Sequence, residues 1–237
     1  MVLPLSILVM HLGFGLGLNE PSLIAEAPSA VVPPEHDANS FTNGTGVTTL
    51  TLVHTCGSGA NRALLISAGS GEDSEVNRDV ATVTVNGSLA TLMVKTNDGT
   101  WTFNSGWYYV APNVGTNHIL VTYINPQDQA CAGAMSLTGV NQTTPVDTAV
   151  ANAGSGTTPS VTASSATTDL VVASLTTDDD GTSFDITGGG TLRWKVSQVG
   201  SDTGYAQGTY EGAASVATSW TTTDEFYSVW AVSVNPP

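Results

Sequence analysis

The sequence predicts an all-β fold, a single antiparallel β-sandwich of the jelly-roll or immunoglobulin-like kind with an extended N-terminal arm. Threonine is abundant, and its β-branched side chain suits a pleated, half-solvated strand surface. Lys and Glu, which commonly fill helix surfaces, are scarce. Short apolar-alternating runs recur between turn signals, and no run of helical period and useful length follows the N-terminal segment.

The N-terminal segment, residues 1–18, is apolar and contains no charged side chain. We expect it to be an uncleaved arm that docks on a neighbour, through Leu3, Leu5, Ile7, Leu8, Val9, Leu12, Phe14, Leu16 and Leu18. A secretory signal peptide is the alternative, which the small pair Ala25 and Ala27 allows but the missing positive n-region disfavours. A membrane-spanning helix is disfavoured because the apolar run is marginal in length and glycine-rich at its end.

Residues 19–40 are predicted to form a linker, because four prolines and scattered acidic residues favour an extended, semi-rigid chain. The β-sandwich domain is expected over residues 41–237. A length of 237 residues fits one large domain or two small ones, and a hydrophobic content of 41% is enough for a core. We favour one domain.

The predicted strands follow one another at sandwich-like spacing. They are Val47–His54, Ala63–Ala68, a hairpin within Val80–Val94, Gly106–Val110, His118–Ile124, Ala130–Val140, Ser160–Ala163, Leu170–Leu175, Thr191–Val199, Tyr205–Tyr210, Ser215–Trp220 and Phe226–Val234.

Local signals support individual elements of this series. Asn86-Gly87 between two alternating runs is the strongest short hairpin signal in the chain. The stretch from Thr143 to Thr158 is expected to be either a linker between two small domains or a long connection between sheets. ALLIS at Ala63–Ser67 and LVVAS at Leu170–Ser174 are similar, but five residues are too few to establish a repeat.

The charge balance excludes whole classes of partner. Five Lys and Arg face 20 Asp and Glu, which gives a formal net charge of -15. A nucleic-acid binder needs a basic face to neutralise phosphates, so that class is excluded. Attraction to an anionic membrane surface is disfavoured for the same reason.

The chain has two cysteines, Cys56 and Cys131, each in or beside a predicted strand. A disulfide between them would stabilise the fold in an oxidising compartment, and two buried free thiols are the alternative. A zinc site is not expected, because no CxxC spacing is present.

No other set of residues predicts a reaction. The four histidines form no HExxH or HxH motif, no GxSxG elbow is present, and no cofactor is expected. The weak candidates for calcium are Asp178, Asp179 and Asp180, which precede Gly181, and a second acidic group spans Glu72–Glu75 with Asp79 near by. A solvated turn is the simpler interpretation of both. The five tryptophans are expected mainly in the core, although they could also line a sugar platform.

Three stretches carry a family resemblance: HTCGSGANRALLI at His54–Ile66, LTGVNQTTP at Leu137–Pro145, and SVWAVSVNP at Ser228–Pro236. Together they resemble a β-sandwich module that recurs in phage virion proteins and in bacterial extracellular proteins. The resemblance implies a fold and a virion or cell-surface setting, and no catalytic residues. A single module with an apolar arm resembles a capsid decoration (cement) protein or a short fibre component of a bacteriophage.

The sequence therefore predicts a non-enzymatic virion structural protein that docks on the shell through its arm. Its expected partners are the major capsid protein or another virion protein and further copies of itself, with a trimer suited to local threefold positions. The alternative is a secreted or cell-surface carbohydrate-binding or adhesion module, and a secreted hydrolase is the third hypothesis.

Overall fold

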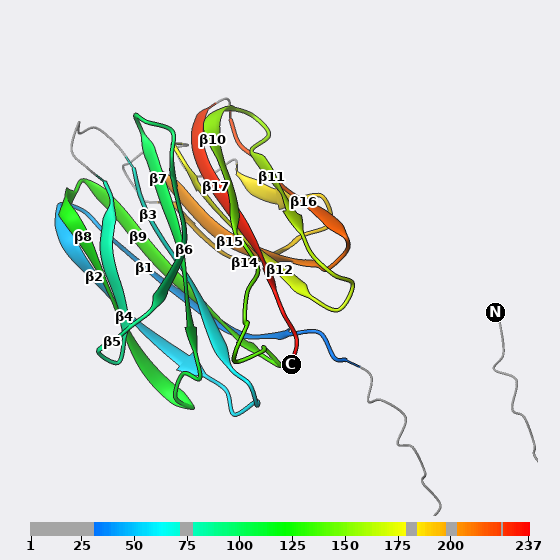
Figure 1. Cartoon of the computed structure of the whole chain (residues 1–237). Helices are drawn as coiled ribbons and strands as arrows, with labels where there is room; N and C mark the ends of the chain where they lie inside the picture. Colours follow the sequence, from blue (N-terminus) through cyan, green and yellow to red (C-terminus); the bar gives the residue numbers. More distant parts are fainter. Residues whose placement is uncertain (1–30, 72–77, 179–183, 198–202, 224) are drawn as a thin grey trace, which may run out of the picture. The chain divides into compact units, whose positions relative to one another are not determined.

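The structure, a computed structural model, describes residues 31–71, 78–178, 184–197, 203–223 and 225–237. The docking arm at residues 1–18 lies outside the described residues. The compact unit, Val31–Pro237, is all-β in its described part, and its sheets are antiparallel (Figure 1). The predicted all-β, antiparallel β-sandwich architecture is confirmed, but the described residues form two such sandwiches in tandem rather than a single one.

The described residues of this unit form four sheets. Sheet A orders β1 (Glu35–Gly44), β9 (Gln129–Thr138), β3 (Ala63–Gly71), β7 (Thr102–Val110) and β6 (Thr91–Asn97). Sheet B orders β2 (Val47–Cys56), β8 (Gly115–Gln127), β4 (Val80–Val85) and β5 (Ser88–Leu89). Sheet C orders β10 (Val150–Gly156), β17 (Glu225–Val234), β12 (Leu170–Thr177), β15 (Gly204–Glu211) and β14 (Thr191–Ser197). Sheet D orders β11 (Ser160–Ser164), β16 (Ser215–Thr221) and β13 (Asp185–Thr187).

Sheets A and B form a jelly roll. Apart from β6, the described part of the first half has eight strands. When these eight are renumbered from one to eight in chain order, sheet A runs 1-8-3-6 and sheet B runs 2-7-4-5. That order is the jelly-roll topology rather than the immunoglobulin-like one. The core between the two sheets contains Leu50, Leu52, Ile119 and Val121 from sheet B and Leu64 from sheet A.

Sheets C and D repeat the same pattern. Strand for strand, β10, β17, β12, β15 and β14 take the places of β1, β9, β3, β7 and β6. Sheet D holds the counterparts of β2, β8 and β4. The second core packs Val171, Ala173 and Leu175 of β12 against Val216 and Trp220 of β16.

The short similarity between ALLIS and LVVAS therefore reflects a structural repeat. The two segments are β3 and β12, the middle strands of sheets A and C. A second similarity was missed: TLMVK in β6 and TLRWK in β14 both carry a register shift between their second and fourth residues. The fold is thus a tandem duplication of one sandwich.

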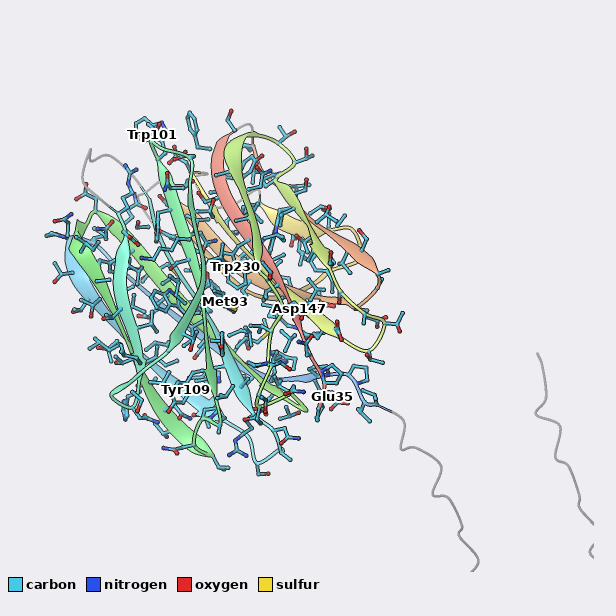
Figure 2. The ribbon with its side chains drawn as sticks, in the orientation of Figure 1. Glu35, Met93, Trp101, Tyr109, Asp147 and Trp230 are labelled. Atoms are coloured by element: carbon cyan, nitrogen blue, oxygen red, sulfur yellow. The ribbon has the colours of Figure 1, made fainter. Side chains whose placement is uncertain are left out.

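The two halves pack through sheets A and C, so the layers run B, A, C, D (Figure 1). Leu65 and Met135 of sheet A meet Val172, Trp230 and Val232 of sheet C in an apolar core. Met93 of β6 packs against the cluster that contains Trp230, and Figure 2 labels both residues.

A buried polar seam runs beside this core. The Oγ atoms of Ser67 and Ser174, which hold equivalent places in the two middle strands, lie 2.6 Å apart. Asn104 Oδ1 accepts hydrogen bonds from Ser67 Oγ at 3.1 Å and from Trp230 Nε1 at 3.0 Å. Thr102 Oγ1 lies 2.8 Å from Ser228 Oγ. Each of these groups is buried, so the hydrogen bonds fix how the halves fit together.

Two boundaries differ from the prediction. Residues 35–40 are not linker but the first part of β1, because their backbone pairs with β9 as far as Glu35 opposite Thr138. The stretch 143–158 contains β10, whose weakly apolar sequence VANAGSG hides an edge strand paired with β17.

Candidate functional site

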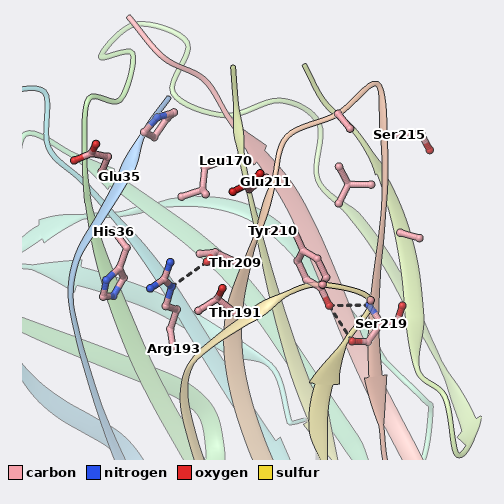
Figure 3. A pocket seen from close by; sticks show the side chains of 16 residues that line it. Glu35, His36, Leu170, Thr191, Arg193, Thr209, Tyr210, Glu211, Ser215 and Ser219 are labelled. Carbon is pink, nitrogen blue, oxygen red and sulfur yellow. Dashed lines mark hydrogen bonds between the residues drawn. The ribbon is translucent and has the colours of Figure 1, made fainter. Parts of the chain in front are cut away.

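The described residues form a groove with a cavity volume of about 840 Å³ beside β14, an edge strand of sheet C (Figure 3). It lies where the start of β1 approaches β14, β15 and β16, so both halves contribute residues to it. Its polar lining comprises Glu35, His36, Thr191, Arg193, Thr209, Tyr210, Glu211, Ser215 and Ser219.

Arg193 is the central cation of the groove. It is the extra residue of the β14 bulge, because Leu192 and Trp194 face the consecutive residues Gly208 and Gln207 of β15. Its Nε donates to Thr209 Oγ1 at 2.9 Å, which orients the guanidinium (Figure 3). Among the described residues, no group accepts a hydrogen bond from its Nη1 or Nη2.

His36 lies beside Arg193 in the groove wall (Figure 3). Its Nε2 is buried and has no hydrogen-bond partner in the described part of the chain. Burial lowers the pKa of His36 below its ordinary value, the Arg193 charge lowers it further, and Asp37 acts in the opposite direction. A neutral imidazole at pH 7 follows, and it can donate or accept a hydrogen bond.

The floor of the groove depends on a glycine turn. Gly188 and Gly189 between β13 and β14 have φ values of 68° and 84°, a left-handed conformation that favours glycine. A Cβ on Gly188 would lie 3.2 Å from Ser219 Oγ. Tyr210 is buried rather than a stacking platform, because its hydroxyl donates to Ser219 O at 2.8 Å and accepts from Ser219 N at 2.9 Å.

The first half has no cation at the position equivalent to Arg193. Met93 holds the bulge position in β6 that Arg193 holds in β14. Its Cε would lie 3.1 Å from a Cβ built on Gly106, and it packs against the core between the halves. Comparison of TLMVK with TLRWK would have singled out Arg193 from the sequence, as the position at which the two copies differ in character.

The outer face of sheet B is a second surface of note. None of the residues of β2, β4, β5 and β8 is Asp, Glu, Lys or Arg. Leu120 is 39% exposed and stands between Thr51 and Thr84 in the strand register, with Leu89 one strand further. Val53 is also exposed on this face, opposite His118. We call this surface the sheet B face.

The two cysteines are free and buried, so of the two alternatives left open by the sequence the structure shows the buried thiols. Cys131 faces Asn43 in the β1–β9 register, whereas Cys56 interacts with Ser136, five positions further along β9. Five strand residues span about 16 Å, far beyond disulfide reach. The two thiols stay apart because Cys56 ends β2 whereas Cys131 lies near the start of β9, at the opposite end of the sandwich.

The acidic candidates for calcium gain no support. Asp178 donates its backbone N–H to Phe226 O at 2.9 Å, while Asp179 and Asp180 lie outside the described residues, as does Glu72–Glu75. Asp79 forms an ion pair with Lys95 at 2.6 Å. No group of three or more His, Cys, Asp or Glu side chains in the described ranges is arranged to hold a metal ion.

One serine and one histidine are paired, but not as a catalytic set. Ser40 Oγ lies 2.7 Å from Nδ1 of His54, which is 1% exposed. Asp37, the nearest acid, accepts instead from Gly57 N at 2.7 Å and Ser136 Oγ at 2.8 Å. A nucleophile needs a base that a third group orients and a substrate can reach, and this pair lacks both.

The remaining predicted residues are mostly structural. Four of the five tryptophans are buried, as expected: Trp107, Trp194, Trp220 and Trp230. Trp101 is partly exposed, and its ring lies 6.2 Å from the Phe226 ring in a tilted pair.

No family model matches the chain, and no curated protein matches it significantly. None of the elements in the described ranges is a helix long and apolar enough to cross a membrane.

Proposed function

We propose that this chain is a non-enzymatic structural protein of a virion, a decoration or cement protein that packs on a shell. The sheet B face carries the proposal. In a chain of net charge -15, a complete outer sheet without a charged side chain can be covered by a neighbour without burying an ion. Cores of protein interfaces are depleted in charged residues for the same reason.

The body suits such a role. The two sandwiches share an apolar core and a buried polar seam, so a load on one half is passed to the other. The proposal assigns to the apolar residues of segment 1–18 a contact with the major capsid protein or another virion protein. Self-association, with a trimer as the expected state, is part of the same proposal.

The test is particle association of sheet-face variants. Leu120→Lys places a charge at the centre of the sheet B face, and we expect the protein to leave the particle fractions of a density gradient while its melting temperature stays unchanged. Val114→Lys is the control, because Val114 is an exposed apolar residue as well, at 56% against 39% for Leu120, and it precedes β8 rather than lying within a strand of the face.

The outcomes are exclusive. Loss of association for Leu120→Lys and not for Val114→Lys supports the proposal. A wild-type chain that never sediments with particles, or association that both variants retain, contradicts it. The secreted or cell-surface carbohydrate-binding alternative has its own observation, the groove around Arg193, which does not depend on a virion setting.

A further inference from the structure

We infer that the groove around Arg193 and His36 is a binding site for a neutral oligosaccharide. Its volume of about 840 Å³ falls within the range of about 300–1,000 Å³ that small-molecule sites occupy. Its apolar lining comes from Pro34, Leu170, Val216, two alanines and the Tyr210 ring, and the polar groups around them favour a hydrophilic occupant.

The polar groups match a sugar's hydroxyls rather than an anion. A hydroxyl both donates and accepts, so its site needs donors and acceptors together. The Nη atoms of Arg193 supply free donors, and the exposed carboxylates of Glu35 and Glu211 supply acceptors. An anionic ligand would face those two carboxylates and an overall charge of -15.

The buried Nε2 of His36 points to the same conclusion. A buried polar atom without a partner costs free energy, and a ligand that bonds to it removes that cost. Its neighbour Arg193 has its guanidinium held in place by Thr209 before any ligand arrives (Figure 3). Pre-positioned groups lose less entropy on binding.

Comparison of the two halves shows that the sandwich fold does not by itself produce this groove. At the equivalent bulge, Met93 is packed against the core between the halves instead of lining a groove. The shared sandwich therefore does not require an arginine there. A substitution of Arg193 by Met, the residue at the equivalent bulge, therefore tests the groove.

The experiment measures binding of defined trisaccharides to the full chain by saturation-transfer NMR and calorimetry. The probes are maltotriose, cellotriose, mannotriose and chitotriose, with trigalacturonic acid as the anionic comparison. We expect at least one neutral probe to bind, and Arg193→Met to weaken it at least about tenfold, the loss of a charge-assisted hydrogen bond. Glu211→Gln is expected to weaken it as well.

Lys195→Met is the matched control, since it removes the same charge from the same strand outside the groove. It should leave affinity unchanged within about twofold, and melting temperatures show that each variant is folded. Absence of binding by every neutral probe at millimolar concentration overturns the inference. So does equal affinity of wild type and Arg193→Met, or binding of trigalacturonic acid alone. None of these results depends on particle association, so the inference fails or stands separately from the proposed function.

Discussion

Asn104 offers the sharpest test of how the two halves are joined. It is fully buried and makes four hydrogen bonds: it accepts from Ser67 Oγ and Trp230 Nε1, and it donates to Ser174 Oγ at 3.2 Å and Ser228 O at 3.3 Å. Asn104→Ala leaves the indole N–H of Trp230 without a partner, at a cost of about 1–3 kcal/mol, and also removes the remaining bonds. A total loss of about 2–4 kcal/mol follows.

In a body of this size, about 2–4 °C of melting temperature corresponds to each kcal/mol, so we expect a decrease of about 4–16 °C. The assay is a double-mutant cycle with Trp230→Phe, read by urea unfolding. Because each substitution removes one end of the same hydrogen bond, their effects should be less than additive by about 1–2 kcal/mol.

Asn117→Ala is the control for this cycle. Asn117 is also buried, but its Nδ2 bonds to Asn113 O at 2.9 Å and Gly115 O at 3.0 Å, within the first half. Its effect should add to that of Trp230→Phe. A coupling between Asn104 and Trp230 within about 0.3 kcal/mol of zero would refute the polar seam between the halves.

Three further predictions concern stability. Burial lowers the pKa of His54, so the unfolded chain takes up the proton first as the pH falls. The free energy of unfolding should therefore decrease below pH 6.5 until the pH reaches the folded-state pKa, and His54→Gln should flatten this decline in a series of urea titrations. Burial raises the pKa of Cys56 to about 11 and that of Cys131 well above its ordinary value. A thiol reagent at pH 8 should therefore label neither cysteine in the native protein and both in urea, and dithiothreitol should not change the melting temperature. Labelling of the native protein as fast as that of the unfolded protein would be the contrary result. Gly87 has a φ of 83°, and a Cβ built on it would have nothing within 4 Å. Gly87→Ala should therefore lower the free energy of unfolding by about 1–2 kcal/mol through backbone strain alone, and an unchanged urea midpoint would argue against the left-handed turn.

Periodicity and turn chemistry were enough to predict the strands that carry the cores. The buried run at Ala63–Ala68 became β3, and Asn86-Gly87 became a hairpin turn in which both φ values are positive, 51° and 83°. These signals are local, so a single sequence contains them.

The missed elements are those whose stability comes from distant partners. β1 has a polar sequence, EHDANSFTNG, and is a strand only because β9 lies beside it almost a hundred residues later. β10 depends on β17 in the same way. A pattern of side chains cannot reveal such pairing, because backbone groups form it.

The groove was missed for a related reason. His36 fell in the predicted linker and Arg193 in an ordinary strand, and only the fold brings them together. The duplication was detectable in principle, but five similar residues at ALLIS and LVVAS were too few. The matched bulges in TLMVK and TLRWK support the duplication. In both segments the second and fourth residues face consecutive residues of the neighbouring strand, which leaves the third residue as the bulge.

The central claim, that the chain is a structural protein of a particle docked by its apolar arm, is tested most directly by mass spectrometry on the natively produced protein. Intact mass and N-terminal peptides would be measured across the fractions of a density gradient. The account predicts a chain that starts at Met1 or Val2 and sediments with large particles. A chain that begins near Pro28 and is found only in the soluble extracellular fraction would contradict it.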